Sequence, residues 1–125
     1  MRNYKSWKMR NFRNYEVWAL SHELTKKIYK VTESFPDSEK YQIIRQMQRA
    51  AFSIPSNFAE GCGRESDKDF NRFVQMALGS AHELEYFIIL SRDLDYIGDN
   101  SYKELNDEVN LVKMKLYALG RKLRP

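Results

Sequence analysis

Hydrophobic residues recur at the spacing of an α-helix along most of this 125-residue chain. β-branched residues are sparse and no long segment alternates apolar and polar residues, so strands are not expected. Four amphipathic helices are predicted, at about 15–34, 38–60, 66–94 and 101–123. Because the connections are short, the expected fold is all-α, an antiparallel up-down-up-down four-helix bundle. The four apolar stripes are Val17, Leu24, Ile28, Val31 and Phe35; Ile43, Met47, Ala50, Ile54 and Phe58; Phe70, Val74, Ala77, Ala81, Leu84 and Ile88; and Leu105, Val109, Val112, Leu116, Leu119 and Leu123.

Capping residues and helix breakers set the predicted boundaries. Ser66 precedes Asp69 by three residues, which resembles a capping box with Asp in place of the usual Glu or Gln. Gly61 and Gly63 are expected to end the second helix. Pro55 lies inside that helix and removes one backbone hydrogen bond, so a bend is expected just before it. The residues predicted to cap the helix N-termini are Asn14, Asp37 or Ser38, Ser66 and Ser101.

The second and third helices carry apolar residues outside their main stripes. A small bundle buries only one broad face of each helix, so a second apolar face indicates either a covered position or a contact between subunits. A homo-oligomer is favoured over a monomer with scattered surface aromatics. These additional residues are Phe52 and Ala59 on the second helix and Met76, Tyr86, Phe87 and Leu90 on the third.

A row of polar residues borders the apolar stripe of the second helix. Polar groups at a boundary between helices or subunits need hydrogen-bond partners, which the third helix can supply. Two interpretations stay open, a structural polar network that fixes the packing register and a pocket for a ligand or nucleic acid. The row comprises Arg49, Ser53, Asn57 and Glu60, and its expected partners are Ser80, Glu83 and Glu85.

Basic residues are concentrated at the two ends of the chain. Residues 1–13 and 113–125 each carry five basic residues and no acidic one, whereas the segment between them has 11 basic and 17 acidic residues. This asymmetry indicates contact with a polyanion, or else two solvated ends that aid solubility. The predicted organisation is a basic, aromatic N-terminal arm (1–13) followed by the bundle domain (14–125).

The arm interleaves aromatic and basic residues, a pattern that suits unpaired bases and phosphates. The alternative is that Trp7 or Phe12 packs on the bundle or on a neighbouring subunit. The candidate nucleic-acid-binding residues are Arg2, Lys5, Trp7, Lys8, Arg10 and Arg13 in the arm and Lys113, Lys115, Arg121, Lys122 and Arg124 at the C-terminus.

Recognisable catalytic chemistry is missing from the sequence, so a non-enzymatic protein without cofactor or metal is expected. There is no phosphate-binding loop, dinucleotide fingerprint or nucleophile-base motif. The two histidines, His22 and His82, do not follow a Glu at the spacing of a di-iron bundle, and Cys62 is the single cysteine. A cation held by Glu60, Glu83 and Glu85 for RNA cleavage is a minor alternative. The absence of a bilayer-length apolar segment or a secretory signal favours a cytoplasmic protein without a membrane partner.

The sequence resembles the bacterial four-helix bundle proteins encoded in intervening sequences of 23S ribosomal RNA genes. The resemblance covers about residues 12–119 and is strongest over Gln46-Met47-Gln48-Arg49-Ala50-Ala51-Phe52-Ser53-Ile54-Pro55-Ser56-Asn57-Phe58-Ala59-Glu60-Gly61. It implies a homopentamer. That family is also similar to the accessory proteins of diversity-generating retroelements, pentameric barrels with basic surfaces that bind nucleic acid and a reverse transcriptase.

Together these features predict a homo-oligomeric bundle that binds nucleic acid, structured RNA or DNA, through its basic ends. The alternative is a protein-interaction scaffold, in which the additional apolar faces dock a partner such as a reverse transcriptase or polymerase. Salt distinguishes the two, because phosphate contacts weaken steeply with rising salt and apolar docking does not.

Overall fold

The computed structural model describes residues 9–124, which contain four long helices and no strand. The prediction of an all-helical chain with four helices is therefore confirmed for these residues. Two short 3-10 helices and one π-helical turn complete the secondary structure. In chain order the elements are η2 (Phe12–Asn14), α1 (Glu16–Thr32), η3 (Asp37–Glu39), the π-helical η4 (Lys40–Ile44), α2 (Arg45–Cys62), α3 (Asp67–Asp93) and α4 (Asp99–Leu123).

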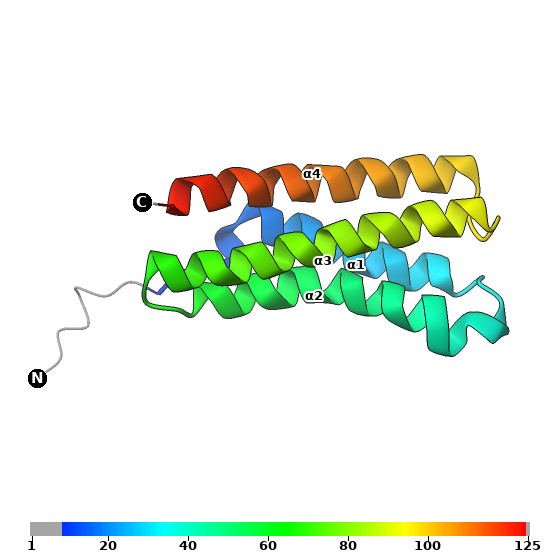
Figure 1. Ribbon diagram of the computed structural model, residues 1–125, viewed down its shortest axis with the longest axis horizontal. Helices are drawn as coiled ribbons and strands as arrows, with labels where there is room; N and C mark the ends of the chain where they lie inside the picture. Colours follow the sequence, from blue (N-terminus) through cyan, green and yellow to red (C-terminus); the bar gives the residue numbers. More distant parts are fainter. Residues whose placement is uncertain (1–8, 125) are drawn as a thin grey trace, which may run out of the picture.

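The four helices lie side by side around one elongated core (Figure 1). Helix α2 contacts α1 and α3, and α4 contacts α3 and α1. The α1–α2 and α3–α4 connections lie at one end of the molecule, whereas the α2–α3 connection and the C-terminus lie at the other (Figure 1). No helix within residues 9–124 combines the length and apolar character needed to cross a bilayer.

The predicted apolar stripes form the core. Burying each large apolar side chain contributes roughly 1.5–3 kcal/mol, which is the main stabilisation of such a bundle. Three stripe residues near the helix ends, Val31, Leu119 and Leu123, are only partly buried and pack against the core from its edge. The largest fully buried side chains are Leu24, Ile28, Met47, Ile54, Phe58, Phe70, Val74, Leu84, Ile88, Val109, Val112 and Leu116.

Of the four predicted N-caps, one is confirmed and three are wrong. Ser66 caps α3, since its Oγ accepts a hydrogen bond from the Asp69 backbone N–H at 3.1 Å. Asn14 instead ends η2, and Tyr15 occupies the N-cap position of α1. The Tyr15 ring packs edge-on against Phe58 at 5.1 Å, so aromatic packing fixes where the chain enters α1. Ser101 lies inside α4, which begins two residues earlier after Gly98.

The start of the second helix also differs from the prediction. Neither Asp37 nor Ser38 caps α2, because the chain forms η3 and then the wider π-helical η4 before regular α-helix begins at Arg45. Within this segment the Tyr96 hydroxyl donates a hydrogen bond to the Glu39 carboxylate at 3.0 Å. Tertiary contact with the α3–α4 connection, rather than local capping, therefore organises this turn.

Gly61 does not end α2 but lies buried within its last turn, and Gly63 is the C-cap residue. A Cβ atom on Gly61 would lie 2.6 Å from Cβ of Phe73 on α3. The residue is glycine because the two helices approach too closely here for any side chain.

Pro55 is accommodated in α2 by a hydroxyl from the neighbouring helix. Its missing N–H leaves the carbonyl of Ala51 without the usual intrahelical donor. Thr25 of α1 donates from Oγ1 to this Ala51 oxygen at 3.1 Å, and its hydroxyl also lies 2.8 Å from the Ser21 oxygen. α2 continues through the proline as regular helix.

We predict that Thr25→Val lowers the free energy of unfolding by about 1–2 kcal/mol, because it leaves the buried Ala51 carbonyl unpaired. Chemical denaturation measures this change, and Thr25→Ser serves as a control that retains the hydroxyl. In a Pro55→Ala background the restored backbone N–H reaches Ala51, so the cost of Thr25→Val falls by about 1 kcal/mol. Equal costs in the two backgrounds would contradict the assignment.

Candidate nucleic-acid interface

Arg10 anchors the N-terminal segment to the α2–α3 connection. Its Nη1 donates to the Arg64 carbonyl oxygen at 2.7 Å, and its Nη2 forms an ion pair with Asp67. The guanidinium carbon also lies 4.4 Å from the centroid of the Phe70 ring. With its side chain only 19% exposed, Arg10 is committed to the fold and is poorly placed to meet a polyanion.

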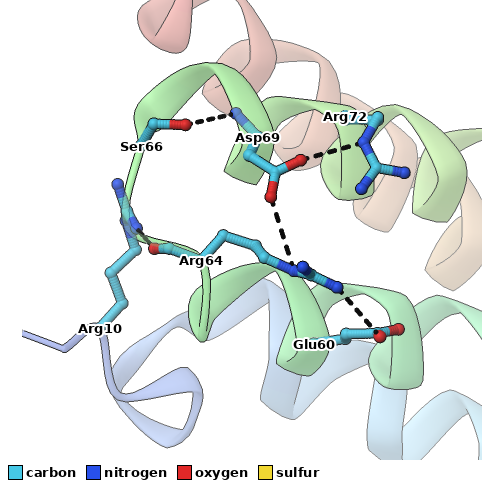
Figure 2. Close-up of polar contacts among 6 residues, drawn as sticks. All are labelled: Arg10, Glu60, Arg64, Ser66, Asp69 and Arg72. Carbon is cyan, nitrogen blue, oxygen red and sulfur yellow. Dashed lines mark hydrogen bonds and ion pairs between the residues drawn. The ribbon is translucent and has the colours of Figure 1, made fainter.

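Next to this anchor, Asp69 bridges two arginines (Figure 2). Its Oδ1 lies 3.0 Å from Nε of Arg72, and its Oδ2 lies 3.6 Å from Nε of Arg64. Nη2 of Arg64 also lies 3.4 Å from a Glu60 carboxylate oxygen. Both guanidinium groups lie over the Phe73 ring, at 4.7 Å for Arg64 and 4.5 Å for Arg72. An aromatic face and a carboxylate thus hold two cations in one place.

The C-terminal end of α4 lies at the same end of the bundle. A Cβ on Gly120 would meet the Gln75 amide nitrogen at 2.6 Å and Asn71 Oδ1 at 3.3 Å, so α4 closes tightly on the first turns of α3. Beyond this contact, three basic side chains are exposed and form no ion pair with residues 9–124. They are Arg121, Lys122 and Arg124.

The remaining candidate residues divide between paired and exposed positions. Lys113 is mostly buried and binds Glu85 at 2.6 Å, and Lys115 lies 3.3 Å from Glu16. Arg13 is exposed, 5.1 Å from the Phe12 ring, while Phe12 packs edge-on against Trp18 at 4.9 Å. The other arm candidates, Arg2, Lys5, Trp7 and Lys8, lie outside the described residues.

The polar residues predicted to form one network satisfy separate local partners. Asn57 Nδ2 donates to the Ser53 carbonyl oxygen at 2.9 Å on its own helix, and Glu60 contacts Arg64. Glu85 binds Lys113 of α4, which together with smaller effects lowers the pKa of Glu85. Within residues 9–124 no hydrogen bond joins the α2 row, including Arg49, to the third-helix candidates Ser80, Glu83 and Glu85.

Several large apolar side chains face away from the core. Phe52, Met76 and Tyr86 are exposed, whereas Phe87 and Leu90 pack against the core from its edge. A further exposed group, not anticipated from the sequence, lies on the outer side of α4, with Met114 at 68% and Tyr117 at 52% exposed and Leu111 nearby. Met114 and Tyr117 also line a groove between α3 and α4.

Reactive chemistry is sparse in the described part of the chain. Cys62 is buried, and desolvation raises the pKa of its thiol to about 11. No cluster of three His, Cys, Asp or Glu side chains suited to a metal ion occurs among residues 9–124. Among the described residues, the prominent surface features are charged and apolar contact groups.

Sequence reasoning missed the Arg64–Asp69–Arg72 cluster. The sequence feature that could have indicated this cluster is Asp69, which occupies the capping-box position where Glu or Gln is usual. Although the Asp69 N–H completes half of that box with Ser66, its carboxylate binds the two arginines. The two arginines themselves fall in the acidic middle of the chain, where segment charge hides them.

Comparison with known proteins identifies similar chains. The model of a family described as 23S rRNA-intervening sequence protein matches residues 13–118. A crystal structure of a protein of unknown function from the S23 ribosomal protein family of Bacteroides thetaiotaomicron is 25% identical, with a TM-score of 0.77. The match covers 82% of this chain and 96% of that one. No curated protein matches the chain significantly.

We predict that Arg10→Ala lowers the free energy of unfolding by about 1–3 kcal/mol, because a charged hydrogen bond to a carbonyl, an ion pair and a ring contact are lost together. Arg13→Ala is the matched control. It removes the same type of side chain from an exposed position nearby and is expected to change stability by less than about 0.5 kcal/mol. Chemical denaturation of both variants measures the difference, and similar costs would show that Arg10 is not an anchor.

Proposed function

Because the model of the 23S rRNA-intervening sequence protein family matches residues 13–118, the chain belongs to that family. From this premise we propose that it is a non-enzymatic protein that binds nucleic acid, structured RNA in particular. The binding surface is the end of the bundle that carries the α2–α3 connection and the C-terminus (Figure 1). The name of the family, which refers to ribosomal RNA, supports RNA over DNA as the ligand.

One observation carries the proposal, the group of exposed basic side chains at this end. Arg121, Lys122 and Arg124 extend from the last turn of α4 and are not neutralised by acidic neighbours in residues 9–124. At the opposite end, residues 93–99 hold three Asp and no basic residue. The separation of charge along the bundle would orient a polyanion toward the basic end. Phosphate contacts of this kind provide affinity without base recognition.

The RNA proposal predicts that the triple variant Arg121→Gln, Lys122→Gln, Arg124→Gln weakens RNA binding at least tenfold. It also reduces the slope of log affinity against log salt by about 2–3, as expected when three phosphate contacts are lost. Titration of a structured RNA hairpin at two or more salt concentrations measures both quantities. A variant without residues 1–8, which retains Arg10, provides a further test of the predicted arm.

A second triple variant provides the control. Lys26→Gln, Lys30→Gln, Lys40→Gln removes the same charge from exposed positions outside the basic end, so it is expected to change affinity by less than about threefold. An equal loss of RNA affinity in the two triple variants would mean that only the net charge of the protein matters. Absence of salt-sensitive binding by the intact protein would refute RNA binding and favour a protein-interaction scaffold.

We further propose that the chain forms an up-down-up-down bundle that assembles as a homo-oligomer, through exposed apolar side chains such as those on the outer side of α4. The neighbouring pair Met114 and Tyr117 is exposed next to an apolar groove, which is the character of a contact surface. Assembly would multiply the basic ends and raise the affinity for RNA by avidity. The same surface would suit a protein partner if the chain acts as a scaffold.

The assembly proposal predicts that Met114→Glu lowers the molar mass measured by light scattering, because a charge must then be desolvated in the subunit contact. Met9→Glu introduces the same change at another exposed methionine, and its mass is expected to equal that of the unmodified protein. A monomeric unmodified protein, or an unchanged mass for Met114→Glu, would contradict this role for α4.

A further inference from the structure

We propose that Arg64 and Arg72 form a phosphate-binding fork, positioned by Asp69 and Phe73, that contacts the RNA backbone. This inference rests on the proposed function and adds a site to it. The two arginines come from different elements, Arg64 from the α2–α3 connection and Arg72 from the second turn of α3. They converge on the carboxylate of Asp69 (Figure 2), and both also lie over the ring of Phe73.

Asp69 approaches both arginines from the Nε side. The contacts are 3.0 Å to Arg72 Nε and 3.6 Å to Arg64 Nε. A guanidinium group held through Nε keeps its terminal nitrogens available, and in Figure 2 those of Arg72 point away from Asp69. No residue among 9–124 accepts a hydrogen bond from the Nη atoms of Arg72, whose side chain is 58% exposed. Two such donors match the oxygens of a phosphate group.

The ring of Phe73 fixes the orientation of the two guanidinium groups of the fork. This ring is almost fully buried, and Cζ of each arginine lies within 5 Å of the ring centroid. The close approach at Gly61 holds the base of this side chain against α2. Arg10 fixes the other side of the site, because it binds the backbone carbonyl of Arg64. The donors are therefore positioned before a ligand arrives, which reduces the entropic cost of binding.

The balance of charge favours a phosphodiester. Asp69 and Glu60 together balance the two guanidinium charges while Glu60 is paired with Arg64, and one positive charge becomes available to a singly charged phosphate when Glu60 turns away. Glu60 lies at the edge of the site, 3.4 Å from Arg64 Nη2, with a side chain 57% exposed that can turn into solvent. Lys68, exposed in the first turn of α3, adds a further positive charge. Exposed ion pairs of this type contribute about 0–1 kcal/mol to stability, so their main effect here is on orientation.

For one substitution, the fork predicts a change in RNA affinity opposite to the change that net charge alone would cause. Asp69→Asn removes a negative charge from the basic end, so general attraction would strengthen RNA binding. If Asp69 positions the two arginines, the same substitution weakens binding by about three- to tenfold. Asp107→Asn is the matched control, because it makes the same charge change at an exposed acid on α4 that pairs with Lys103. It is expected to leave affinity unchanged or slightly stronger.

Arg72→Lys supplies the second variant. It keeps the positive charge but loses the planar donor pair and the Nε contact with Asp69, so a comparable loss of RNA affinity is expected. Arg92→Lys, at the acidic end of the bundle, is its control and is expected to bind normally. Affinity for the hairpin is measured by titration, with thermal denaturation of each variant to confirm that it is folded.

The outcomes separate the fork from the general function. Weaker binding by both Asp69→Asn and Arg72→Lys, with normal binding by the two controls, supports the fork. If the unmodified protein binds RNA and Asp69→Asn binds as tightly or more tightly, the fork is refuted while RNA binding stands. Failure of the unmodified protein to bind RNA refutes both. Loss of binding to an acidic peptide but not to RNA in these variants would assign the fork to a protein ligand and overturn the proposal.

Discussion

The close approach of α2 and α3 at Gly61 is the constraint on which one end of the molecule depends. Because no side chain separates the two helices there, Phe73 packs directly on the α2 backbone. Its ring then becomes the surface on which Arg64 and Arg72 lie, and the connection between the helices is short enough for Arg10 to reach across it. Packing of one glycine thereby determines where positive charge is presented. A larger residue would move the helices apart and displace every charged group above them.

Whether a basic side chain is available to a ligand depends on whether an acidic side chain pairs with it, more than on how many basic residues the chain has. Arg10, Lys113 and Lys115 each have an acidic partner, and the first two are largely buried. Arg13 and the end of α4 lack such partners within residues 9–124 and remain exposed. A similar distinction applies to apolar residues, since the inner side of α4 is buried over most of its length while Met114 and Tyr117 on its outer side face solvent. The bundle is complete as a fold and still offers two chemically different surfaces.

The helical periodicity of the sequence predicted the four helices and nearly all of the core, because burial repeats with the helix turn and each stripe is long. Boundaries were less predictable. Asn14, Ser101 and Gly61 are residue types with strong local preferences for helix ends. In the structure, however, Tyr15 is the N-cap of α1, α4 already begins at Asp99, and Gly61 lies within α2 against Phe73. The candidate site shows the same limit. Charge segregation identified the C-terminal basic residues, but the cluster around Asp69 joins residues whose proximity depends on tertiary packing.

The Arg10 anchor also has a consequence for the order of folding. Its partners Arg64 and Asp67 lie 54 and 57 residues further along the chain, so their contact encloses α1, α2 and the loops around them. Closing a loop of this size costs chain entropy that short-range helix contacts do not. The α1–α2 hairpin can therefore form while Arg10 is still free, and during synthesis the segment ahead of α1 finds its final position only after the start of α3 has left the ribosome.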